Sequence, residues 1–360
     1  PPRSTLSSSS AASDVYKRQI QGNDCISVTN PYDQTVIGNV TVAQENDTHQ
    51  AIEKALQQKK TLTRYQRFEI LDQSRRELLN RKEEFAQLIT SEAGLCMRET
   101  LYEVGRACDV LQFSAMESLK EDGQVFSCDV SPQGKARKIF TLREPLRVAV
   151  AITPFNHPIN QVAHKLGPAI AAGTPIILKP SEKTPLTAIK FAELLYKNGL
   201  PGPMLSVLLG PTQEVAERLV QDERVEMVSF TGSVSVGKHI ARSAGYKKLV
   251  LELGGNDPLI VLEDADLDQA VHLACEGAFR NSGQRCTAVK RIMVQQSILK
   301  KFTQAMVERA KSYTAGDPSS METRVGTVID EASAIHLEKT IKKAVADGAR
   351  VLLGCLLYTS

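Results

Sequence analysis

The sequence feature that most restricts the fold is a regular alternation of short apolar, β-branched runs with longer helical patterns, which begins near Leu146. Runs suited to buried strands occur at 147–152, 175–178, 204–208, 225–230, 248–253 and 259–262. Strands that alternate with helices are typical of βαβ units, in which the strands lie parallel and helices cover the sheet. We therefore predict an α/β fold built on a parallel sheet, with a second α/β region after Asp266.

Two helical patterns and a hairpin precede this alternation. The first helical pattern, at 63–94, opens with Thr63 and Gln66 at the spacing of a capping box. The second, at 99–119, is apolar on two faces, so we expect it to be buried on both sides. The stretch 125–142 is predicted to form a hairpin.

Polar turns follow several of the predicted strands, where ligands of open α/β sheets bind. Phe230-Thr-Gly-Ser233 leads from a strand into a helical pattern, and amides exposed at a helix start suit a pyrophosphate. The spacing differs from GxGxxG, and such a turn is more often only a turn. In Lys179-Pro-Ser-Glu182, the carboxylate can accept hydrogen bonds from ribose hydroxyls and would repel a 2′-phosphate. A solvated surface ion pair is the alternative interpretation.

One of the seven cysteines differs from the others in its context. Cys286 lies in a polar, glycine-containing turn beside Arg285, where a cation favours the thiolate. A thiolate attacks carbonyl carbon well when its pKa lies below the free value of about 8.5. Glu252 lies at the end of an apolar strand before two glycines, where a carboxylate can activate water. A small buried cysteine without a chemical role is the alternative.

The stretches Leu-Glu252-Leu-Gly-Gly-Asn256 and Phe-Arg-Asn-Ser-Gly-Gln-Arg-Cys286 resemble the two signature motifs of the aldehyde dehydrogenase superfamily. The resemblance implies a Rossmann-like parallel-sheet NAD domain, a second α/β catalytic domain and a β-hairpin for oligomerisation. It makes Cys286 the nucleophile, Glu252 the base for thioester hydrolysis, and Asn156 the oxyanion donor. Asn156 could instead simply cap a helix. The implied cofactor ligands are Thr153, Pro154, Lys179, Ser181, Glu182, Phe230, Thr231, Gly232, Ser233, Gly237, Leu253 and Gly254.

The reaction implied by the resemblance is oxidation of an aldehyde to a carboxylate, with NAD favoured over NADP because of Glu182. The presence of Glu252 favours hydrolysis over transfer to coenzyme A. A structural or binding protein on the same fold is the non-enzyme alternative, and the joint presence of Asn156, Lys179, Glu252 and Cys286 argues against it.

Three cationic side chains could bind an anionic tail on the substrate. Arg285 precedes the nucleophile, His157 follows Asn156, and Arg106 lies on an otherwise apolar helix face. Arginine forks suit phosphonate, phosphate or carboxylate oxygens. The stretch 282–291 also resembles the branch of phosphonoacetaldehyde and non-phosphorylating glyceraldehyde-3-phosphate dehydrogenases. Within that branch, Asn156-His157-Pro158 and Leu253-Gly-Gly-Asn256-Asp257-Pro258 resemble the phosphonoacetaldehyde side and favour phosphonoacetaldehyde. Glyceraldehyde 3-phosphate, succinate semialdehyde and lactaldehyde are the alternatives. Each cation also has a plain alternative: lowering the thiol pKa for Arg285, neutral packing for His157 and an ion pair for Arg106.

The expected organisation assigns 20–124 and 145–253 to the NAD-binding domain, 125–144 to the oligomerisation hairpin and 254–355 to the catalytic domain. We interpret the Ser-rich 1–19 and the abrupt 356–360 as non-native tails. A later Glu-x-Phe-Gly-Pro segment of the family is missing, so we expect a C-terminally truncated catalytic domain in a fragment that could lack activity.

Composition limits the partners and the compartment. A net charge of +3 does not indicate nucleic acid, and no apolar stretch approaches the ~20 residues of a membrane helix. The cysteines show neither CxxC nor metal-ligand spacing, so we predict no metal site and a reducing, cytoplasmic location. With the resemblance, the expected partners are a small aldehyde and further copies of the chain, as a homodimer or homotetramer.

Overall fold

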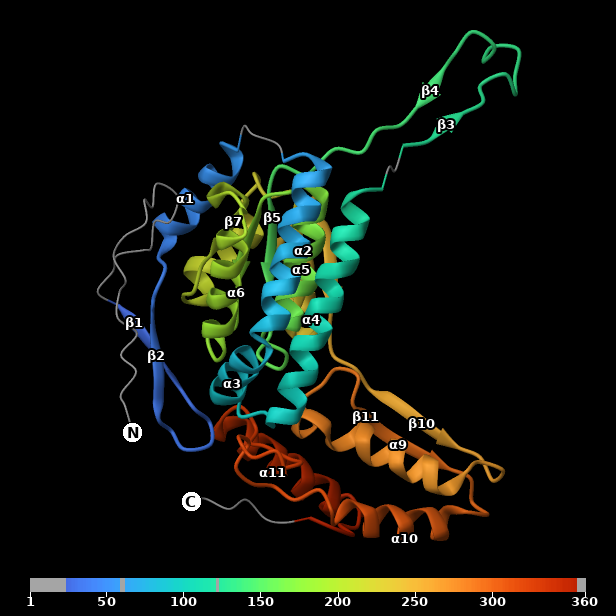
Figure 1. Cartoon of the computed structure of the whole chain (residues 1–360). Helices are drawn as coiled ribbons and strands as arrows, with labels where there is room; N and C mark the ends of the chain where they lie inside the picture. Colours follow the sequence, from blue (N-terminus) through green and yellow to red (C-terminus); the bar gives the residue numbers. More distant parts are fainter. Residues whose placement is uncertain (1–23, 59–61, 121–122, 355–360) are drawn as a thin grey trace.

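The computed structural model describes residues 24–58, 62–120 and 123–354. Its centre is a sheet of five parallel strands in the order β7-β6-β5-β8-β9, with helices on both faces (Figure 1). The predicted α/β fold with a parallel sheet is confirmed. The tails predicted at 1–19 and 356–360 fall outside the described residues. The strands are β5 (Ala149–Ile152), β6 (Ile176–Lys179), β7 (Leu205–Val207), β8 (Met227–Thr231) and β9 (Lys248–Glu252).

The order of these strands creates a switch point in the middle of the sheet. The chain runs outward from β5 through β6 to β7, and then returns to place β8 on the other side of β5. The connections after β5 and β8 therefore leave in opposite directions. In open α/β sheets, such a point at the carboxyl ends of the strands is where ligands bind.

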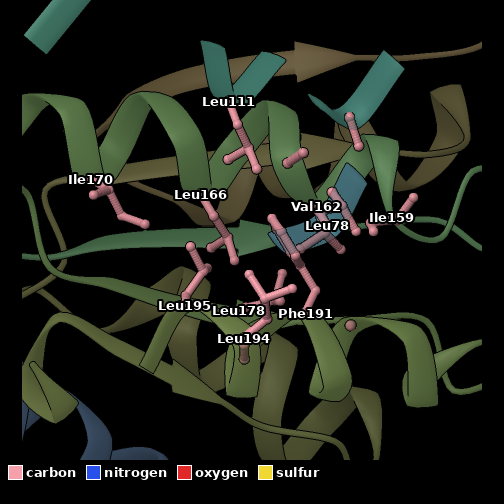
Figure 2. Packing of buried hydrophobic residues seen from close by; sticks show 14 of the residues in the cluster. Leu78, Leu111, Ile159, Val162, Leu166, Ile170, Leu178, Phe191, Leu194 and Leu195 are labelled. Atoms are coloured by element: carbon pink, nitrogen blue, oxygen red, sulfur yellow. The ribbon is translucent and has the colours of Figure 1, made fainter. Parts of the chain in front are cut away.

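Side chains of the sheet alternate between two apolar cores, as both faces are covered. Ala151 and Leu178 face one core, and Figure 2 shows how the latter packs there with Leu166 and Phe191. Val150 and other residues face the second core. The helices that contribute to the first core are α2 (Arg64–Asn80), α3 (Lys82–Ala93), α4 (Met97–Ser118), α5 (Asn160–Ala172) and α6 (Pro185–Lys197). The helices that contribute to the second core are α1 (Glu45–Leu56), the π-helical turn Thr212–Glu217, α7 (Arg218–Gln221) and α8 (Val234–Ser243).

The helical pattern predicted at 63–94 forms two helices. The capping box is confirmed, because the Thr63 amide donates to Gln66 Oε1 (2.9 Å) and the Gln66 amide donates to Thr63 Oγ1 (3.2 Å). The helix breaks at Arg81, whose φ and ψ are −106° and 23°, and resumes as α3. Gly94 ends α3 in the left-handed conformation at φ 68°, which glycine adopts without strain.

The expectation that the helix now called α4 is buried on two sides is wrong. One stripe, which includes Val104 and Leu111, is fully buried against the helices beside it. On the other face, Tyr102 is 53% exposed and Phe113 is 70% exposed. The helix lies on the outside of its layer, and among the described residues little covers that face.

Two antiparallel pairs lie apart from the central sheet. β1 (Cys25–Thr29) pairs with β2 (Val36–Thr41). β3 (Val125–Phe126) pairs with β4 (Ile139–Phe140), which confirms a hairpin within 125–142. Figure 1 shows that this hairpin extends far from the body of the molecule.

The segment after β9 forms a second α/β region. β10 (Asp257–Val261) and β11 (Val289–Val294) pair in parallel and pack with α9 (Leu267–Phe279) and α10 (Leu299–Ala310) around Val261, Cys275 and Phe302. The strand predicted at 259–262 thus belongs to this separate sheet. The remaining elements are the 3₁₀ turns Gly202–Met204 and Arg280–Gly283 and the helix α11 (Glu331–Ala346).

Candidate active site

The predicted functional residues gather where four neighbouring strands end. β5 leads to Asn156, β6 ends at Lys179, β8 ends at Thr231 and β9 ends at Glu252. The register aligns Thr231 with Glu252 across β8 and β9. Because all four strands are parallel, these residues share one edge of the sheet at the switch point.

The turn that carries Cys286 has an unusual backbone. Asn281, Ser282 and Gly283 adopt left-handed conformations, with φ of 57°, 53° and 72°. Such a conformation costs a non-glycine residue on the order of 1–3 kcal/mol and persists where neighbouring groups fix it. The side chain of Asn281 donates to the Asn156 carbonyl (2.9 Å), and Ser282 Oγ donates to the Gly326 carbonyl (3.1 Å). The turn then delivers Cys286, half-buried, to the start of β11.

Asn156 is tied to this turn in both directions. Its Nδ2 donates to the carbonyl of Gln284 (2.7 Å), while its own carbonyl accepts from Asn281. A side-chain amide has two N–H groups, so one remains for another acceptor near Cys286. The structure therefore brings the predicted oxyanion donor to the nucleophile turn, although the two are distant in sequence.

Glu252 reaches the same place through the two glycines that follow it. A Cβ at Gly255 would lie 2.1 Å from the Cys286 carbonyl oxygen, so only glycine allows the two backbones to approach this closely. Glu252 itself is exposed at the end of β9, where its carbonyl accepts from the Gly232 amide (3.0 Å). An exposed carboxylate beside the thiol turn can hold and activate water.

The sequence interpretation missed Lys165, which lies in α5 and interacts with the charge of Glu252. Lys165 is only 7% exposed, and its Nζ donates to Ser229 Oγ (2.9 Å). Burial lowers the pKa of Lys165 to about 8, and the charge of Glu252 partly opposes this shift. A single lysine within an otherwise apolar helical stretch was the available signal.

The cofactor residues predicted from the turns line the same edge. Lys179 Nζ lies 3.0 Å from Glu182 Oε1, with side chains 10% and 41% exposed. Thr153 is buried, and its amide donates to the Lys179 carbonyl (3.2 Å). The hydroxyl of Thr231 is buried without a hydrogen-bond partner in the described part of the chain, as expected of a group that meets a ligand.

The start of α8 is shaped by Ser233 and two glycines. Ser233 Oγ accepts from the Val236 amide (3.3 Å). A Cβ at Gly237 would come within 2.3 Å of the Leu253 side chain, so this glycine lets Leu253 pack on the helix. Gly232 has no room for a Cβ beside the Phe230 ring (2.4 Å). These residues and the exposed amides of α8 fit a dinucleotide phosphate.

The three predicted substrate cations have different surroundings. Arg106 is exposed on α4 and makes no hydrogen bond or ion pair with the described residues. His157 Nδ1 lies 3.5 Å from Oε2 of the buried Glu103. Arg285 donates to the Gly277 carbonyl at the end of α9 (2.9 Å). His157 and Arg285 thus have neighbours within the chain, and the role of the three cations in binding a substrate anion stays a prediction.

Electrostatic contacts still connect these cations with the site. Burial lowers the pKa of Arg285, and its charge interacts with that of Cys286. Desolvation lowers the pKa of His164, with further lowering by Arg106, whereas Glu252 raises it. Arg106 and Glu252 are thus both close enough to His164 for their charges to act on it.

A further arginine, Arg280, was not predicted from the sequence to have a role in the site. It donates through Nε and Nη2 to Glu99 Oε2 (2.9 and 2.8 Å) and lies over the Tyr102 ring at 4.8 Å. These contacts tie the nucleophile turn to α4. Neither Glu99 nor Tyr102 could be matched to Arg280 without the fold.

Within the described residues, no group of three or more His, Cys, Asp or Glu side chains is arranged to hold a metal ion. In the same part of the chain, every helix is too short or too polar to cross a bilayer.

Comparison with known proteins establishes the class. The aldehyde dehydrogenase family profile matches residues 18–359. The chain is 40% identical to 3-sulfolactaldehyde dehydrogenase of Priestia aryabhattai over 328 residues, 91% of this chain and 69% of that protein. It is 35% identical to lactaldehyde dehydrogenase of Methanococcus aeolicus over 336 residues, 91% of this chain and 71% of that protein.

A solved structure agrees with this assignment. Glyceraldehyde-3-phosphate dehydrogenase GapN from Methanocaldococcus jannaschii, complexed with NADP, superposes with a TM-score of 0.88 at 37% identity, covering 93% of this chain and 74% of that one. The chain belongs to the aldehyde dehydrogenase family. It is accordingly an NAD(P)-dependent oxidoreductase, and the similarity to GapN supports the predicted branch.

Proposed function

We propose that this protein oxidises a short aldehyde with an anionic tail to the carboxylate through a covalent intermediate on Cys286. The observation that carries the proposal is the pair of opposed hydrogen bonds that joins Asn156 to the turn of Cys286. This pairing ties the Asn156 amide to the turn that carries the half-buried Cys286, and it supports the proposal because addition to a carbonyl requires a donor near the nucleophile.

In the first half of the reaction, the Cys286 thiolate adds to the aldehyde carbon and forms a thiohemiacetal. The free N–H of Asn156 and the Cys286 amide stabilise the oxyanion that develops. Arg285, which is half-buried and directly precedes Cys286 in the turn, places a positive charge that interacts with the charge of Cys286. A bound nicotinamide would supply the hydride acceptor, and Cys286 would then carry the acyl group as a thioester.

In the second half, Glu252 takes a proton from water, and the resulting hydroxide attacks the thioester. The exposure of Glu252 at the strand end suits this task, because water must reach it. Cleavage of the C–S bond releases the carboxylate and returns the thiolate. The approach of Gly255 to the Cys286 carbonyl holds the base beside the nucleophile.

The test of this mechanism is Cys286→Ala in the complete protein. We expect NADH formation from aldehyde to be abolished while NAD binding, measured by fluorescence titration, persists. Cys25→Ala, at an exposed cysteine of β1, is the matched control and should keep the native rate. Oxidation at the native rate by Cys286→Ala would reject the nucleophile assignment.

We also propose NAD as the preferred cofactor. The Glu182 carboxylate, 3.0 Å from Lys179, suits ribose hydroxyls and would repel a 2′-phosphate. Among similar structures, GapN is complexed with NADP, whereas betaine aldehyde dehydrogenase from Staphylococcus aureus is complexed with NAD+. The Glu182 carboxylate of this chain favours NAD over NADP.

Removing that carboxylate tests the preference. Glu182→Ala should free Lys179 for a phosphate and raise the NADP-to-NAD ratio of kcat/KM about tenfold, by analogy with other close charge contacts. Glu193→Ala, at an exposed glutamate of α6, is the control. A native protein that prefers NADP would contradict the proposal.

The anionic substrate is inferred from Arg106 and from similar proteins. Within the described residues, Arg106 makes no hydrogen bond or ion pair, and its charge acts on His164. An unpaired arginine fork suits acidic oxygens. Similar proteins include a 3-sulfolactaldehyde dehydrogenase, GapN and an aldehyde dehydrogenase from Physcomitrella patens complexed with its product succinate. Their substrates or products carry sulfonate, phosphate or carboxylate groups. Phosphonoacetaldehyde is our proposed substrate within this class.

A substrate series tests the anion site directly. We expect kcat/KM to be higher for phosphonoacetaldehyde, glyceraldehyde 3-phosphate and succinate semialdehyde than for propanal. Arg106→Ala should lower kcat/KM for the three anionic aldehydes about tenfold or more. Arg98→Ala, exposed on the same helix, is the control. Equal losses for all four aldehydes would contradict an anion site, and a preference for lactaldehyde would favour that alternative.

A further inference from the structure

Two buried glutamates perform a similar task at two helix starts. Glu92, at the end of α3, accepts the amides of Leu186 (2.9 Å) and Thr187 (3.1 Å) at the start of α6. It uses one carboxylate oxygen for each amide. Carboxylates are favoured at helix starts, where amides lack partners. Glu92 therefore serves as a structural reference for the second case.

The second glutamate, Glu103 of α4, divides its oxygens differently. Oε1 alone accepts both the Ile159 amide (2.9 Å) and the Asn160 amide (3.0 Å) at the start of α5. Oε2 is left for the imidazole of His157, at 3.5 Å from Nδ1. The side chain of Glu103 is 3% exposed and that of His157 is 23% exposed.

The two atoms that face each other, Glu103 Oε2 and His157 Nδ1, are both buried. Neither Glu103 Oε2 nor His157 Nδ1 has a hydrogen-bond partner in the described part of the chain. A buried carboxylate oxygen without a partner is costly, so a cation or donor opposite it is strongly favoured. Glu103 thus holds the side chain of His157 as well as the backbone two residues further on.

The segment held in this way is the one that carries Asn156. Its far end is fixed by Ile159, which is fully buried in the core shown in Figure 2. Its near end is fixed by Asn281, which donates to the Asn156 carbonyl. Glu103, on α4, binds the turn between these two anchors.

We propose that Glu103 is a positioning residue for the oxyanion amide: through the Ile159 and Asn160 amides and the His157 side chain, it sets the direction of Asn156 Nδ2 toward Cys286. The inference rests on the proposed oxyanion role of Asn156. It gives His157 a task as part of this support. A displacement of about 1 Å at a catalytic group can cost up to about a hundredfold in rate.

The main test is Glu103→Gln in the complete protein, with Glu92→Gln as the matched control. Glutamine keeps a carbonyl oxygen for the helix amides but loses the anionic oxygen opposite His157. In single-turnover NADH formation, we expect the rate constant to fall about tenfold or more with little change in amplitude or aldehyde KM. A merely structural role would lower the amplitude, which counts folded sites, and leave the rate constant unchanged. Glu92→Gln should keep the native rate constant.

A double-mutant cycle with Asn156→Ala then shows whether Glu103 acts through Asn156. Glu103→Gln should add no more than a small further loss in the Asn156→Ala background. An equal fractional loss in both backgrounds, or a native rate constant for Glu103→Gln beside a slow Asn156→Ala, would overturn the inference alone. A native rate for Asn156→Ala would instead reject the oxyanion assignment of the proposed function, and the inference with it.

His157→Asn provides a second test in case Glu103→Gln fails to fold. It removes the imidazole and leaves the helix amides of α5 bonded to Glu103. The expected result is again a slower single-turnover rate constant at native amplitude. A native rate constant in this variant would show that the contact between Glu103 and His157 does not position Asn156, and it would overturn the proposal.

Discussion

Among the three residues that the proposed reaction requires, Glu252 is exposed, whereas Cys286 and Asn156 are half-buried. The difference follows from their tasks. The thiol and the oxyanion donor must enclose the aldehyde, and the base must receive water after the hydride has left. An exposed carboxylate can be reached by the water that it activates.

This division predicts the behaviour of Glu252→Gln. The variant should form a first equivalent of NADH at close to the native rate and then turn over about a hundredfold more slowly, because thioester hydrolysis lacks its base. Stopped-flow absorbance resolves the two phases. Glu263→Gln, at an exposed glutamate after β10, is the control. Loss of the burst together with steady turnover would show that Glu252 also acts before hydride transfer.

At the residue scale, sequence could identify groups that act through their own chemistry and local pattern. Cys286 and Glu252 have recognisable turns around them. Glu103 and Lys165 do not, because their significance comes from partners supplied by distant segments. Glu103, on α4, lies opposite His157 in the segment before α5, and Lys165, on α5, bonds Ser229 on β8. A buried ionisable side chain cannot be told from an exposed one by helical periodicity alone.

At the scale of elements, the hairpin of β3 and β4 is the least self-sufficient part of the described chain. Val125 is 88% exposed and Phe140 is 67% exposed, on strands of only two residues each. An isolated two-stranded hairpin is marginally stable in water. We therefore propose, in line with the division expected for 125–144, that another subunit covers these side chains.

The hairpin proposal predicts that Phe140→Asp shifts the complete protein from oligomer to monomer, because a carboxylate in an apolar interface is costly. Sedimentation equilibrium gives the mass directly. Tyr246→Asp, at a more exposed aromatic after α8, controls for the added charge. An unchanged mass for Phe140→Asp, or a native protein that is monomeric, would contradict the proposal.

Element boundaries show where local pattern stops being sufficient. The apolar stripe at 63–94 continues through Arg81, yet the helix breaks there. Arg81 bonds Glu77 on one side of the break and Glu84 on the other, and α3 turns toward α6. The stripe recorded which residues are buried. It carried no information on the change of helix direction.

At the scale of the whole molecule, the alternation of strands and helices was sufficient to predict the layered parallel sheet. It did not contain the strand order, because periodicity describes each strand separately. The order decides the function. Placing β8 beside β5 brings Thr231 next to the segment that leads to Asn156, and β9 then adds Glu252 at the same edge. The outer face of α4 was misassigned for a related reason, since apolar composition does not reveal what covers a helix.

The contact between Gly255 and the Cys286 carbonyl has a kinetic consequence. A Cβ at Gly255 would lie 2.1 Å from the Cys286 carbonyl oxygen, so the backbone after Glu252 and the nucleophile turn are in direct contact. We therefore expect the proposed change from attacking an aldehyde to hydrolysing a thioester to require no hinge between them. Rotation of the exposed Glu252 side chain is sufficient, and such rotamer changes take picoseconds to nanoseconds. We therefore expect the step between the two proposed chemical halves to depend on a side-chain rotation and not on a loop closure.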